Sequence, residues 1–516
     1  MKTLPLILML ALAVSAQADY TQIWHCSGEN DSSNFGYGVV GVGDQNDDGF
    51  DDILITNWRA GEVFLYYGGN PMDTIPDLIF AEPYYYSYGT LPQQCRDLNG
   101  DGYSDIAVSA DWYGSYGRPK VYVYFGGPNI DNAADLIFTS DHLDSLGSHF
   151  GKYFTMGDFN GDGFYDLGVG ADNYGFVTCG GLDGGKIFVY YGGVDMDTLE
   201  DYTITGQLYN WALTGECLSI SGDVNNDGCD DMLVRTGAGS IDKTIFLGGI
   251  DPDSSADWRF VNSSVQGWSV IVPDVNQDGC DEIVFGYQPN GECCAAFFWG
   301  GDTISASIDV ILSGMSSSQN GLAYAGDINA DGYSDVLLGS IPHGEIYVCF
   351  LNPNMSGWYY SEYTFYHSGF GNMMGYAGDV NGDGIDDIMI SSAYSPYFPF
   401  RGEVFIYSDT TLTPAVPQKP DYSLTTFRLL NNYPNPFNNR SIILFSLDRP
   451  QFIDLNVYNL LGRKVALLTS GQYDRGFHRT FWDGCDFYGN TVSSGIYLLE
   501  LRGQFNRSVR KIEIIK

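Results

Sequence analysis

Apolar and polar residues alternate with a period of two along most of this chain, in short runs that end at glycine-rich or acidic turns. Residues 62–66 read E-V-F-L-Y, and residues 120–124 read K-V-Y-V-Y. β-branched and aromatic residues dominate these runs, and helical periodicity is essentially missing. Because the side chains of a strand point alternately to its two faces, the pattern predicts an all-β fold of many short strands.

These strands belong to a unit that recurs seven times, at intervals of about 50 to 65 residues. In each unit a glycine-rich strand precedes an acidic loop, D-x-N-x-D-G-x-x-D/E, which runs into an apolar strand such as residues 53–55. An alternating strand, often closed by Gly-Gly, and a short strand such as residues 77–80 complete the unit. Four strands repeated seven times predict a seven-bladed β-propeller, which leaves few sheet edges unprotected.

The seventh unit lacks its last strand. Residues 401–408 form its third strand, and the residues that follow are rich in threonine and proline. A replacement lies near the start of the chain, where residues 20–24 read Y-T-Q-I-W. We expect this segment to pair beside residues 401–408 and to cover the exposed edge of the last blade. The predicted propeller therefore spans residues 19–409.

Each acidic loop carries oxygen-bearing side chains at its positions one, three, five and nine. Ca²⁺ prefers six to eight oxygen ligands in a flexible geometry, whereas Mg²⁺ keeps several waters and demands a stricter octahedron. Glycine at position six permits a tight turn, and the backbone carbonyl of position seven and water would complete the shell. An EF-hand would need glutamate at position twelve and flanking helices, but position twelve of the first loop is Ile55, in a predicted strand.

The sequence therefore predicts up to seven structural Ca²⁺ ions. Three carboxylates in one turn repel each other without a cation, so the ions are expected to stabilise the fold. Glu282 is the one departure at position nine, and we expect its site to bind differently. The predicted ligands, loop by loop, are Asp44, Asn46, Asp48 and Asp52; Asp97, Asn99, Asp101 and Asp105; Asp158, Asn160, Asp162 and Asp166; Asp223, Asn225, Asp227 and Asp231; Asp274, Asn276, Asp278 and Glu282; Asp327, Asn329, Asp331 and Asp335; and Asp379, Asn381, Asp383 and Asp387.

The repeat units resemble FG-GAP repeats, the blades of integrin-α-type propellers. Residues 35–36, 150–151 and 370–371 read F-G and precede the acidic loops of units one, three and seven, as in that family. The other units depart from this dipeptide, for example Y-G at residues 88–89. The resemblance covers roughly residues 20–409, and the acidic loop is its most specific element.

The composition changes beyond a proline- and threonine-rich linker at residues 410–427. Short alternating strands over residues 428–516 predict a small β-sandwich. The motifs Y-P-N-P-F, L-G-R-K-V and S-G-I-Y and the final K-I-E-I-I-K resemble the C-terminal sorting domain of type IX secretion substrates, which is similar to Ig-like domains. The resemblance implies contact with the secretion machinery and export across a Gram-negative outer membrane, followed by removal of the domain and then by release or surface attachment of the protein. A plain accessory sandwich that stays attached is the alternative.

Charge and the N-terminus narrow the cellular context. The chain has 24 basic and 64 acidic residues, so we expect neither nucleic acid nor an anionic membrane as a partner. Lys2, an apolar run over residues 4–14 and A-Q-A at residues 16–18 describe a cleavable secretory signal, residues 1–18. No later stretch approaches 18 continuous apolar residues, so no transmembrane segment is predicted and a secreted or surface location is expected.

Ten cysteines follow the signal, and their number is compatible with an oxidising compartment. Cys229 and Cys280 occupy the same position in two consecutive acidic loops. We expect them to be two small buried thiols, with a structural bridge as the alternative.

The longer connections between strands are rich in aromatic residues and are expected on the face opposite the acidic loops. Such loops on a rigid scaffold suit a protein or glycan ligand, which predicts a binding or adhesion module. Neither H-E-x-x-H nor G-x-S-x-G nor a P-loop occurs. The alternative is a secreted hydrolase or lyase directed at glycans or esters, with its acid pair drawn from Asp111, Asp172 and Asp183.

Overall fold

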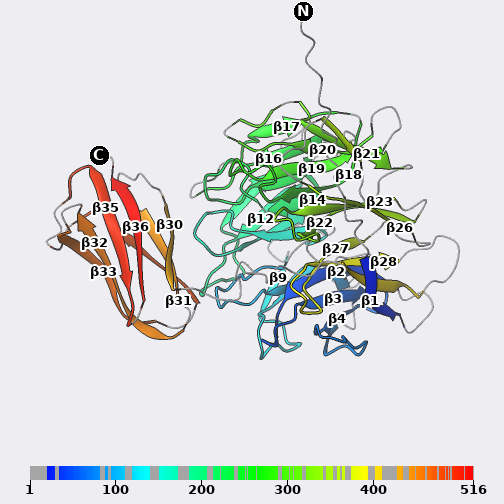
Figure 1. Ribbon diagram of the computed structural model, residues 1–516, viewed down its shortest axis with the longest axis horizontal. Coiled ribbons are helices and arrows are strands. Elements are labelled where there is room, and N and C mark those ends of the chain that lie inside the picture. Colours follow the sequence, from blue (N-terminus) through cyan, green and yellow to red (C-terminus); the bar gives the residue numbers. More distant parts are fainter. Residues whose placement is uncertain are drawn as a thin grey trace, which may run out of the picture.

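The computed structural model describes most of the chain between residues 20 and 514 (Figure 1). The predicted signal, most of the linker and several connections between strands lie outside this part. The described ranges are 20–28, 34–81, 88–90, 95–110, 119–139, 150–171, 185–205, 213–220, 222–236, 242–249, 252, 254–262, 264–288, 293–301, 303–305, 307–315, 321–340, 344–351, 357–360, 363–366, 373–392, 401–409, 427–433, 441–447, 449–459, 462–473, 476–482, 484–485, 487, 491–504 and 506–514.

Seven sheets follow one another along the chain, and each forms one blade whose four main strands are antiparallel. Blade one contains β2 (Phe35–Gly43), β3 (Asp52–Asn57), β4 (Glu62–Tyr66) and β5 (Leu78–Ala81). Blade two contains β6 (Tyr88–Thr90), β7 (Ile106–Ala110), β8 (Lys120–Tyr124) and β9 (Leu136–Thr139). Blade three contains β10 (Phe154–Gly157), β11 (Asp166–Ala171), β12 (Lys186–Tyr190) and β13 (Tyr202–Thr205). Blade four contains β14 (Leu213–Ile220), β15 (Met232–Thr236), β16 (Asp242–Phe246) and β17 (Trp258–Phe260).

The remaining blades complete the ring. Blade five contains β18 (Val265–Val272), β19 (Glu282–Tyr287), β20 (Cys293–Phe298), β21 (Val310–Met315) and a fifth strand, β25 (Gly357–Tyr360). Blade six contains β22 (Gly321–Gly326), β23 (Asp335–Ser340), β24 (Glu345–Cys349) and β26 (Tyr363–Tyr366). Blade seven contains β27 (Met374–Gly378), β28 (Asp387–Ser392), β29 (Glu403–Asp409) and β1 (Tyr20–Ser27).

The hydrophobic core lies between neighbouring blades. A cluster of buried apolar side chains joins each blade to the next; for example, Val284 of blade five packs in one cluster with Val336 of blade six. The cluster between blades seven and one includes Trp24, Ile53 and Ile406. Strand β2 also contacts β27, so the last blade meets the first. These contacts confirm the predicted all-β, seven-bladed propeller.

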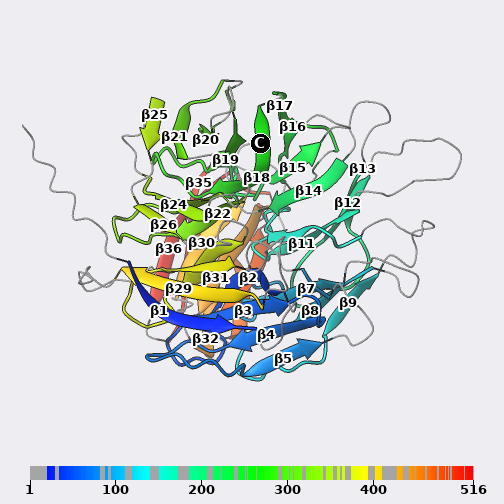
Figure 2. The same ribbon diagram turned by 90° about the vertical axis from the view of Figure 1, so that its right-hand side faces the viewer.

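Strand β1 closes the ring as the sequence predicts. It pairs antiparallel with β29, with Tyr20 opposite Asp409 and Ser27 opposite Glu403. In Figure 2 the blue β1 lies beside the yellow β29. The register shifts between Gln22 and Trp24, and the indole N–H of Trp24 donates to the Asp73 carbonyl at 2.6 Å. The edge of blade seven is thereby covered by a strand that also holds blade one.

Blade five departs from the predicted four strands. Strand β25 comes from the sixth unit and pairs parallel with β21 of blade five, with Val310 opposite Gly357. The chain then returns to blade six, where β26 forms the outer strand. The chain between β24 and β26 is long enough to reach across, and the extra strand covers an edge that would otherwise be unpaired.

The C-terminal part forms two packed sheets. The first contains β30 (Arg428–Tyr433), β31 (Ser441–Leu447) and β34 (Gly476–Trp482). The second contains β33 (Lys464–Tyr473), β32 (Gln451–Asn459), β35 (Gly495–Arg502) and β36 (Arg507–Ile514). Both sheets contribute to one buried cluster, which includes Phe445, Leu455 and Leu499. The arrangement is a β-sandwich, and its predicted Ig-like topology stays a prediction.

Candidate metal centres

The seven acidic loops share one backbone conformation. The glycine at position six has φ between 88° and 100° in every loop. Position four also has a positive φ in every loop, between 56° and 80°. A Cβ built on Gly49 would meet nothing within 4 Å, so the dihedral rather than the available space requires glycine at position six. The repeated motif therefore produces one repeated turn.

Backbone N–H groups hold the side-chain oxygens of each loop in place. In the first loop, Asp48 N–H donates to Asp44 Oδ1 at 3.1 Å and Gly49 N–H donates to Asp44 Oδ2 at 2.8 Å. Asp48 N–H also donates to Asn46 Oδ1 at 3.0 Å, and Phe50 N–H donates to Asp48 Oδ1 at 3.0 Å. The same four hydrogen bonds occur in the other six loops.

The residue at position nine is fully buried in every loop. It begins the second strand of its blade, or directly precedes that strand in blades two and four. Asp52 Oδ2 accepts from Gln45 N–H at 2.7 Å, and its Oδ1 accepts from Gly68 N–H at 2.8 Å. The side chain thereby joins the acidic loop to the Gly-Gly turn after β4. Burial, together with the smaller effect of the charges of Asp44 and Asp48, raises the pKa of Asp52 to about 8.

The donor set fits a hard cation. Each loop offers oxygen ligands from three carboxylates and one side-chain amide, which is the chemistry that Ca²⁺ prefers. Burial raises the pKa of the position-nine carboxyls of Asp231, Glu282 and Asp387 to about 8. Glu282 Oε1 is buried and has no hydrogen-bond partner. The predicted ligand positions of each loop thus lie around one turn, and their role as ligands stays a prediction.

The fifth loop differs from the others in how closely its carboxylates approach. Oxygen atoms of Asp274, Asp278 and Glu282 all lie within 4.8 Å of one another. Among the residues that the structure describes, no other acidic loop brings three carboxylates this close. Glutamate is one methylene longer than the aspartate of the other loops, which allows its carboxylate to reach further into the turn.

The loops are also joined to each other, through residues that the sequence analysis did not single out. Asp51, at position eight of the first loop, accepts from Asp379 N–H at 2.9 Å, and its own N–H donates to the Asp379 carbonyl at 3.1 Å. An aspartate at position eight makes the same side-chain contact with the preceding loop in blades four, five and seven. Two consecutive acidic residues at positions eight and nine, such as Asp51 and Asp52, are the sequence feature that could have indicated this contact between loops.

Further contacts continue this chain of loops. Gly69 N–H donates to the Val380 carbonyl at 2.8 Å, so the Gly-Gly turn of blade one contacts the acidic loop of blade seven. Between blades one and two, a side chain replaces the backbone carbonyl as the acceptor. Gln45, at position two of the first loop, accepts through its Oε1 from Gly127 N–H of the Gly-Gly turn of blade two, at 2.9 Å. Tyr103 Oη donates to Asp47 Oδ2 at 2.7 Å, from position seven of one loop to position four of the loop before it. The acidic loops form a connected ring on one face of the propeller.

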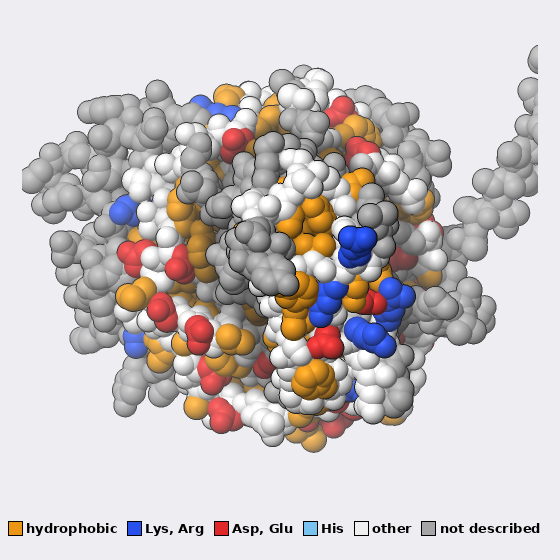
Figure 3. Space-filling model, turned by 90° about the vertical axis from the view of Figure 1, so that its left-hand side faces the viewer, with side chains coloured by type: hydrophobic (Ala, Val, Ile, Leu, Met, Phe, Trp, Pro, Cys, Tyr) orange, Lys and Arg blue, Asp and Glu red, His pale blue; other side chains and the backbone are white. Residues whose placement is uncertain are grey.

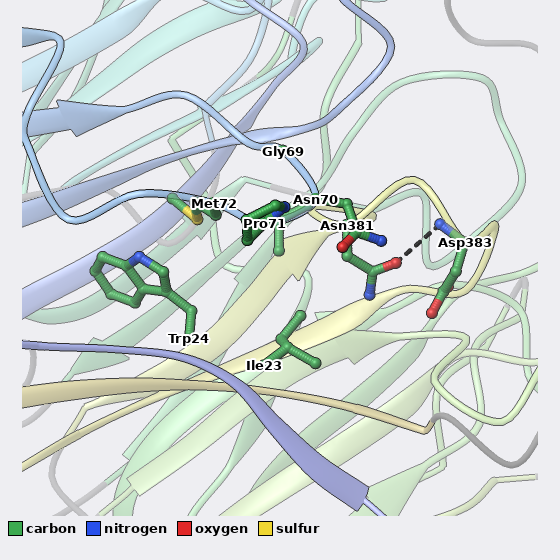
Figure 4. Close-up of a pocket in the computed structure, with 9 residues that line it drawn as sticks. Ile23, Trp24, Gly69, Asn70, Pro71, Met72, Asn381 and Asp383 are labelled. Carbon is green, nitrogen blue, oxygen red and sulfur yellow. Dashed lines mark hydrogen bonds between the residues drawn. The ribbon is translucent and has the colours of Figure 1, made fainter.

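A cavity of about 310 Å³ lies beside the seventh loop, where β1 closes the ring (Figure 4). Ile23 and Trp24 line one side, and residues 69–72 line another. Figure 4 shows Asn381 and Asp383 of the seventh loop on the remaining side, joined by the hydrogen bond from Asp383 N–H to Asn381 Oδ1. The seventh loop therefore lines a cavity together with β1 and the Gly-Gly turn of blade one.

Several sequence-based expectations lie outside the described residues. These are the signal at residues 1–18, the F-G dipeptide at residues 370–371 and the three alternative catalytic residues, Asp111, Asp172 and Asp183. Cys229 and Cys280 are described, and both are buried free thiols, as expected. No helix in the described ranges is long and apolar enough to cross a membrane.

Comparison with known proteins identifies both parts of the chain. Residues 95–124 match the FG-GAP repeat, residues 327–390 match the FG-GAP-like repeat, and residues 431–516 match the secretion system C-terminal sorting domain. The protein therefore carries FG-GAP repeats and a sorting domain. That domain marks it for contact with the secretion machinery and for secretion, with release or attachment at the outer cell surface.

Integrin alpha chains are among the proteins that this chain resembles in sequence. Integrin alpha-5 of Xenopus laevis is 31% identical over 169 residues, which cover 30% of this chain and 16% of that protein. Integrin alpha-8 of Mus musculus is 34% identical over 130 residues, 23% of this chain and 12% of that protein. The chain thus matches less than a fifth of the length of either relative. PorZ, a surface component of the type IX secretion system of Porphyromonas gingivalis, is 13% identical to this chain. The structural comparison has a TM-score of 0.31 and covers 90% of this chain and 64% of that chain.

Proposed function

We propose that this secreted protein is a calcium-stabilised propeller that acts as a binding or adhesion module and is delivered by its C-terminal sorting domain. The main support is the ring of seven acidic loops with one shared conformation and one shared set of hydrogen bonds. A single loop of this composition is also found as an ordinary turn. Seven equivalent loops, each with a buried carboxylate, favour a common bound cation.

In each loop the side chains at positions one, three, five and nine would hold the ion. Ca²⁺ would supply the positive charge that offsets the three carboxylates of a loop. The position-nine side chain also accepts from the Gly-Gly turn in the first four blades, and so joins two turns of one sheet. Position eight joins neighbouring blades, as Asp281 does by accepting from Asp223 N–H at 2.9 Å. Ordering a loop thereby supports both its own blade and the adjacent one.

A melting experiment tests the role of calcium. We expect the melting temperature of the full chain to fall markedly in EGTA and to recover when Ca²⁺ is added in excess, because an ion that binds only the folded state stabilises it by mass action. Mg²⁺ at the same free concentration should restore less. An unchanged melting temperature in EGTA would contradict the calcium assignment.

We infer that the ligand binds the face away from the acidic loops. In an antiparallel blade, the acidic loop and the Gly-Gly turn lie at the same end of the sheet, so the other connections lie at the opposite end. Those connections are rich in tyrosine by sequence, for example P-Y-Y-Y-S-Y at residues 83–88. Tyrosine provides a large contact area and a polar hydroxyl, which suits a protein or glycan ligand.

Binding assays with matched variants test this face. We expect glycan arrays or pull-downs in Ca²⁺ to detect a ligand that the double variant Tyr84→Ser, Tyr85→Ser binds at least about tenfold more weakly. Ile75→Ser is the control, because Ile75 is 71% exposed and lies in the turn between β4 and β5, at the end of the blade that carries the acidic loop. Loss of binding only in the control would place the ligand on the other face. Turnover of a glycan or ester substrate would favour the enzyme alternative.

A further inference from the structure

We propose that the fifth acidic loop holds its Ca²⁺ ion more tightly than the other six loops and keeps it when they have lost theirs. The proposal rests on the calcium-stabilised function above and assigns a distinct role to one of the seven sites. It predicts a partly loaded propeller with a single ion at the loop of Asp274, Asp278 and Glu282.

The first argument is the hydrogen bonding of the position-nine carboxylate. In blade one, both oxygens of Asp52 accept backbone N–H groups, one from Gln45 and one from Gly68. The position-nine aspartates of blades two, three and four have the same two kinds of donor. These donors compete with an ion for the same lone pairs.

The fifth loop differs because its residue at position nine is longer. Glu282 Oε2 accepts from Val275 N–H at 2.7 Å, which is the equivalent loop donor. Glu282 Oε1 has no hydrogen-bond partner, although the side chain is fully buried. A buried carboxylate oxygen without a donor is costly, and a cation bound beside it would remove that cost.

The second argument is the arrangement of the three carboxylates. Oxygen atoms of Asp274, Asp278 and Glu282 lie within 4.8 Å of one another, so this loop needs little rearrangement to surround an ion. Asp335 of the sixth loop also has an oxygen without a partner, but its loop does not show this convergence among the described residues. A site that is already arranged for its ligand binds it more tightly, because the cost of ordering is lower.

The main chain of the fifth loop is fixed from two sides. Asp281 Oδ1 accepts from Asp274 N–H at 2.9 Å, within the loop. Asp281 Oδ2 accepts from Asp223 N–H at 2.9 Å, in the loop of blade four. Asp281 therefore holds the first ligand position of its own loop and of the neighbouring loop, which keeps Asp274 in place before an ion arrives.

Native mass spectrometry of the full chain over graded free Ca²⁺ tests the proposal. We expect a species with one ion to dominate at free Ca²⁺ about tenfold below the level that loads the remaining sites. Glu282→Asp, which restores the residue of the other loops, should remove the one-ion species and leave the higher-loaded species unchanged. Asp387→Asn is the matched control, because it alters position nine of another loop and should leave the one-ion species intact.

The outcomes separate this proposal from the one it rests on. If no ion binds at any concentration, the calcium function itself fails. If ions bind but all seven sites load together, or if Glu282→Asp still shows the one-ion species, the calcium function stands and the special role of the fifth loop is refuted. Melting curves in saturating Ca²⁺ check that each variant folds, and Glu282→Gln provides a second variant that keeps the side-chain length.

Discussion

Single glycines decide how closely the acidic loops can approach the neighbouring turns. A Cβ on Gly68 would lie 2.4 Å from the Asp51 carbonyl oxygen and 2.9 Å from that of Val380. The first contact is within blade one, and the second is with the acidic loop of blade seven. Backbone atoms cannot move aside as a flexible side chain can, so the Gly-Gly turn is a requirement of the ring contacts.

We predict that Gly68→Ala lowers the free energy of unfolding by about 1–3 kcal/mol, because the added methyl group separates two turns that are joined by hydrogen bonds. Gly375→Ala is the control, since a Cβ there would meet nothing within 4 Å and the change should stay within about 0.5 kcal/mol. Denaturant unfolding in Ca²⁺ measures both. Equal effects in the two variants would contradict the steric argument.

The buried carboxylates give the calcium-free protein an unusual dependence on pH. Burial raises the pKa of Asp52 and Glu282 to about 8, whereas such groups titrate near pH 4 in an unfolded chain. The folded state therefore binds more protons than the unfolded state between about pH 4 and pH 8. The free energy of unfolding should therefore fall as the pH rises through this window, because the state that binds more protons is favoured at low pH and here that state is the folded one.

Saturating Ca²⁺ should reverse this trend, because the ion requires ionised ligands and protons displace it as the pH falls. Melting temperatures measured from pH 5 to pH 8, in calcium-free buffer and in excess Ca²⁺, should therefore change in opposite directions. Two curves with the same slope would show that the position-nine carboxylates do not bind the ion.

Local spacing explains which residues of the site could be predicted from the sequence. Positions one, three, five, six and nine act within one turn, so Asp44 and Gly49 could be assigned from a nine-residue pattern. The role of Asp51 could not, because its partner Asp379 lies 328 positions away along the chain and is brought near only by ring closure. The close approach of the three carboxylates in the fifth loop depends on side-chain geometry, which a pattern of residue types does not contain.

At the scale of elements, the position of an outer strand depends on which edge needs cover. Strand β1 could be predicted, because the seventh unit lacked a strand and residues 20–24 offered one. Strand β25 could not, because its parallel pairing with β21 joins different units and follows from the arrangement of blades five and six. The number of predicted strands in each sequence unit therefore predicts the blades, but it does not predict a strand that one unit adds to the edge of a neighbouring blade.

We predict that removal of residues 1–34 lowers the melting temperature and broadens the unfolding transition. The truncated chain lacks β1, which leaves the edge of β29 unpaired and removes Trp24 from the core between blades seven and one. Differential scanning calorimetry in Ca²⁺ is the measurement. Trp24→Phe serves as a milder comparison that keeps the strand. A truncated protein that melts like the full chain would show that β1 does not support the ring.

At the scale of the whole molecule, the two parts differ in charge and in whether they carry the acidic loops. Lys and Arg side chains gather on one side of the face that Figure 3 shows. In the sandwich, Arg502, Arg507, Arg510 and Lys511 are exposed. The propeller contains all seven acidic loops, and residues 428–516 contain none. The sandwich also has its own buried core, which includes Phe445 and Leu499.

We therefore predict two calorimetric transitions, of which only one responds to calcium. Removal of Ca²⁺ should lower the melting temperature of the propeller. The melting temperature of the sandwich should stay within about 2 °C of its value in Ca²⁺, because a domain that binds no ion is not stabilised by the ion through mass action. A variant with Asp383→Asn identifies the propeller transition, since it should shift that transition alone. A single transition that moves as a whole would mean that the two parts unfold together.

The pairing of β1 with β29 also determines when the propeller can close during synthesis of the chain. The chain from Tyr20 to Asp409 takes roughly 20–80 s to synthesise at typical elongation rates. During that time the earliest strand has no partner, and the nascent propeller is an open arc with free ends. The propeller therefore closes only after the last of its strands has been made, and this delay follows from joining the first and last strands in one sheet.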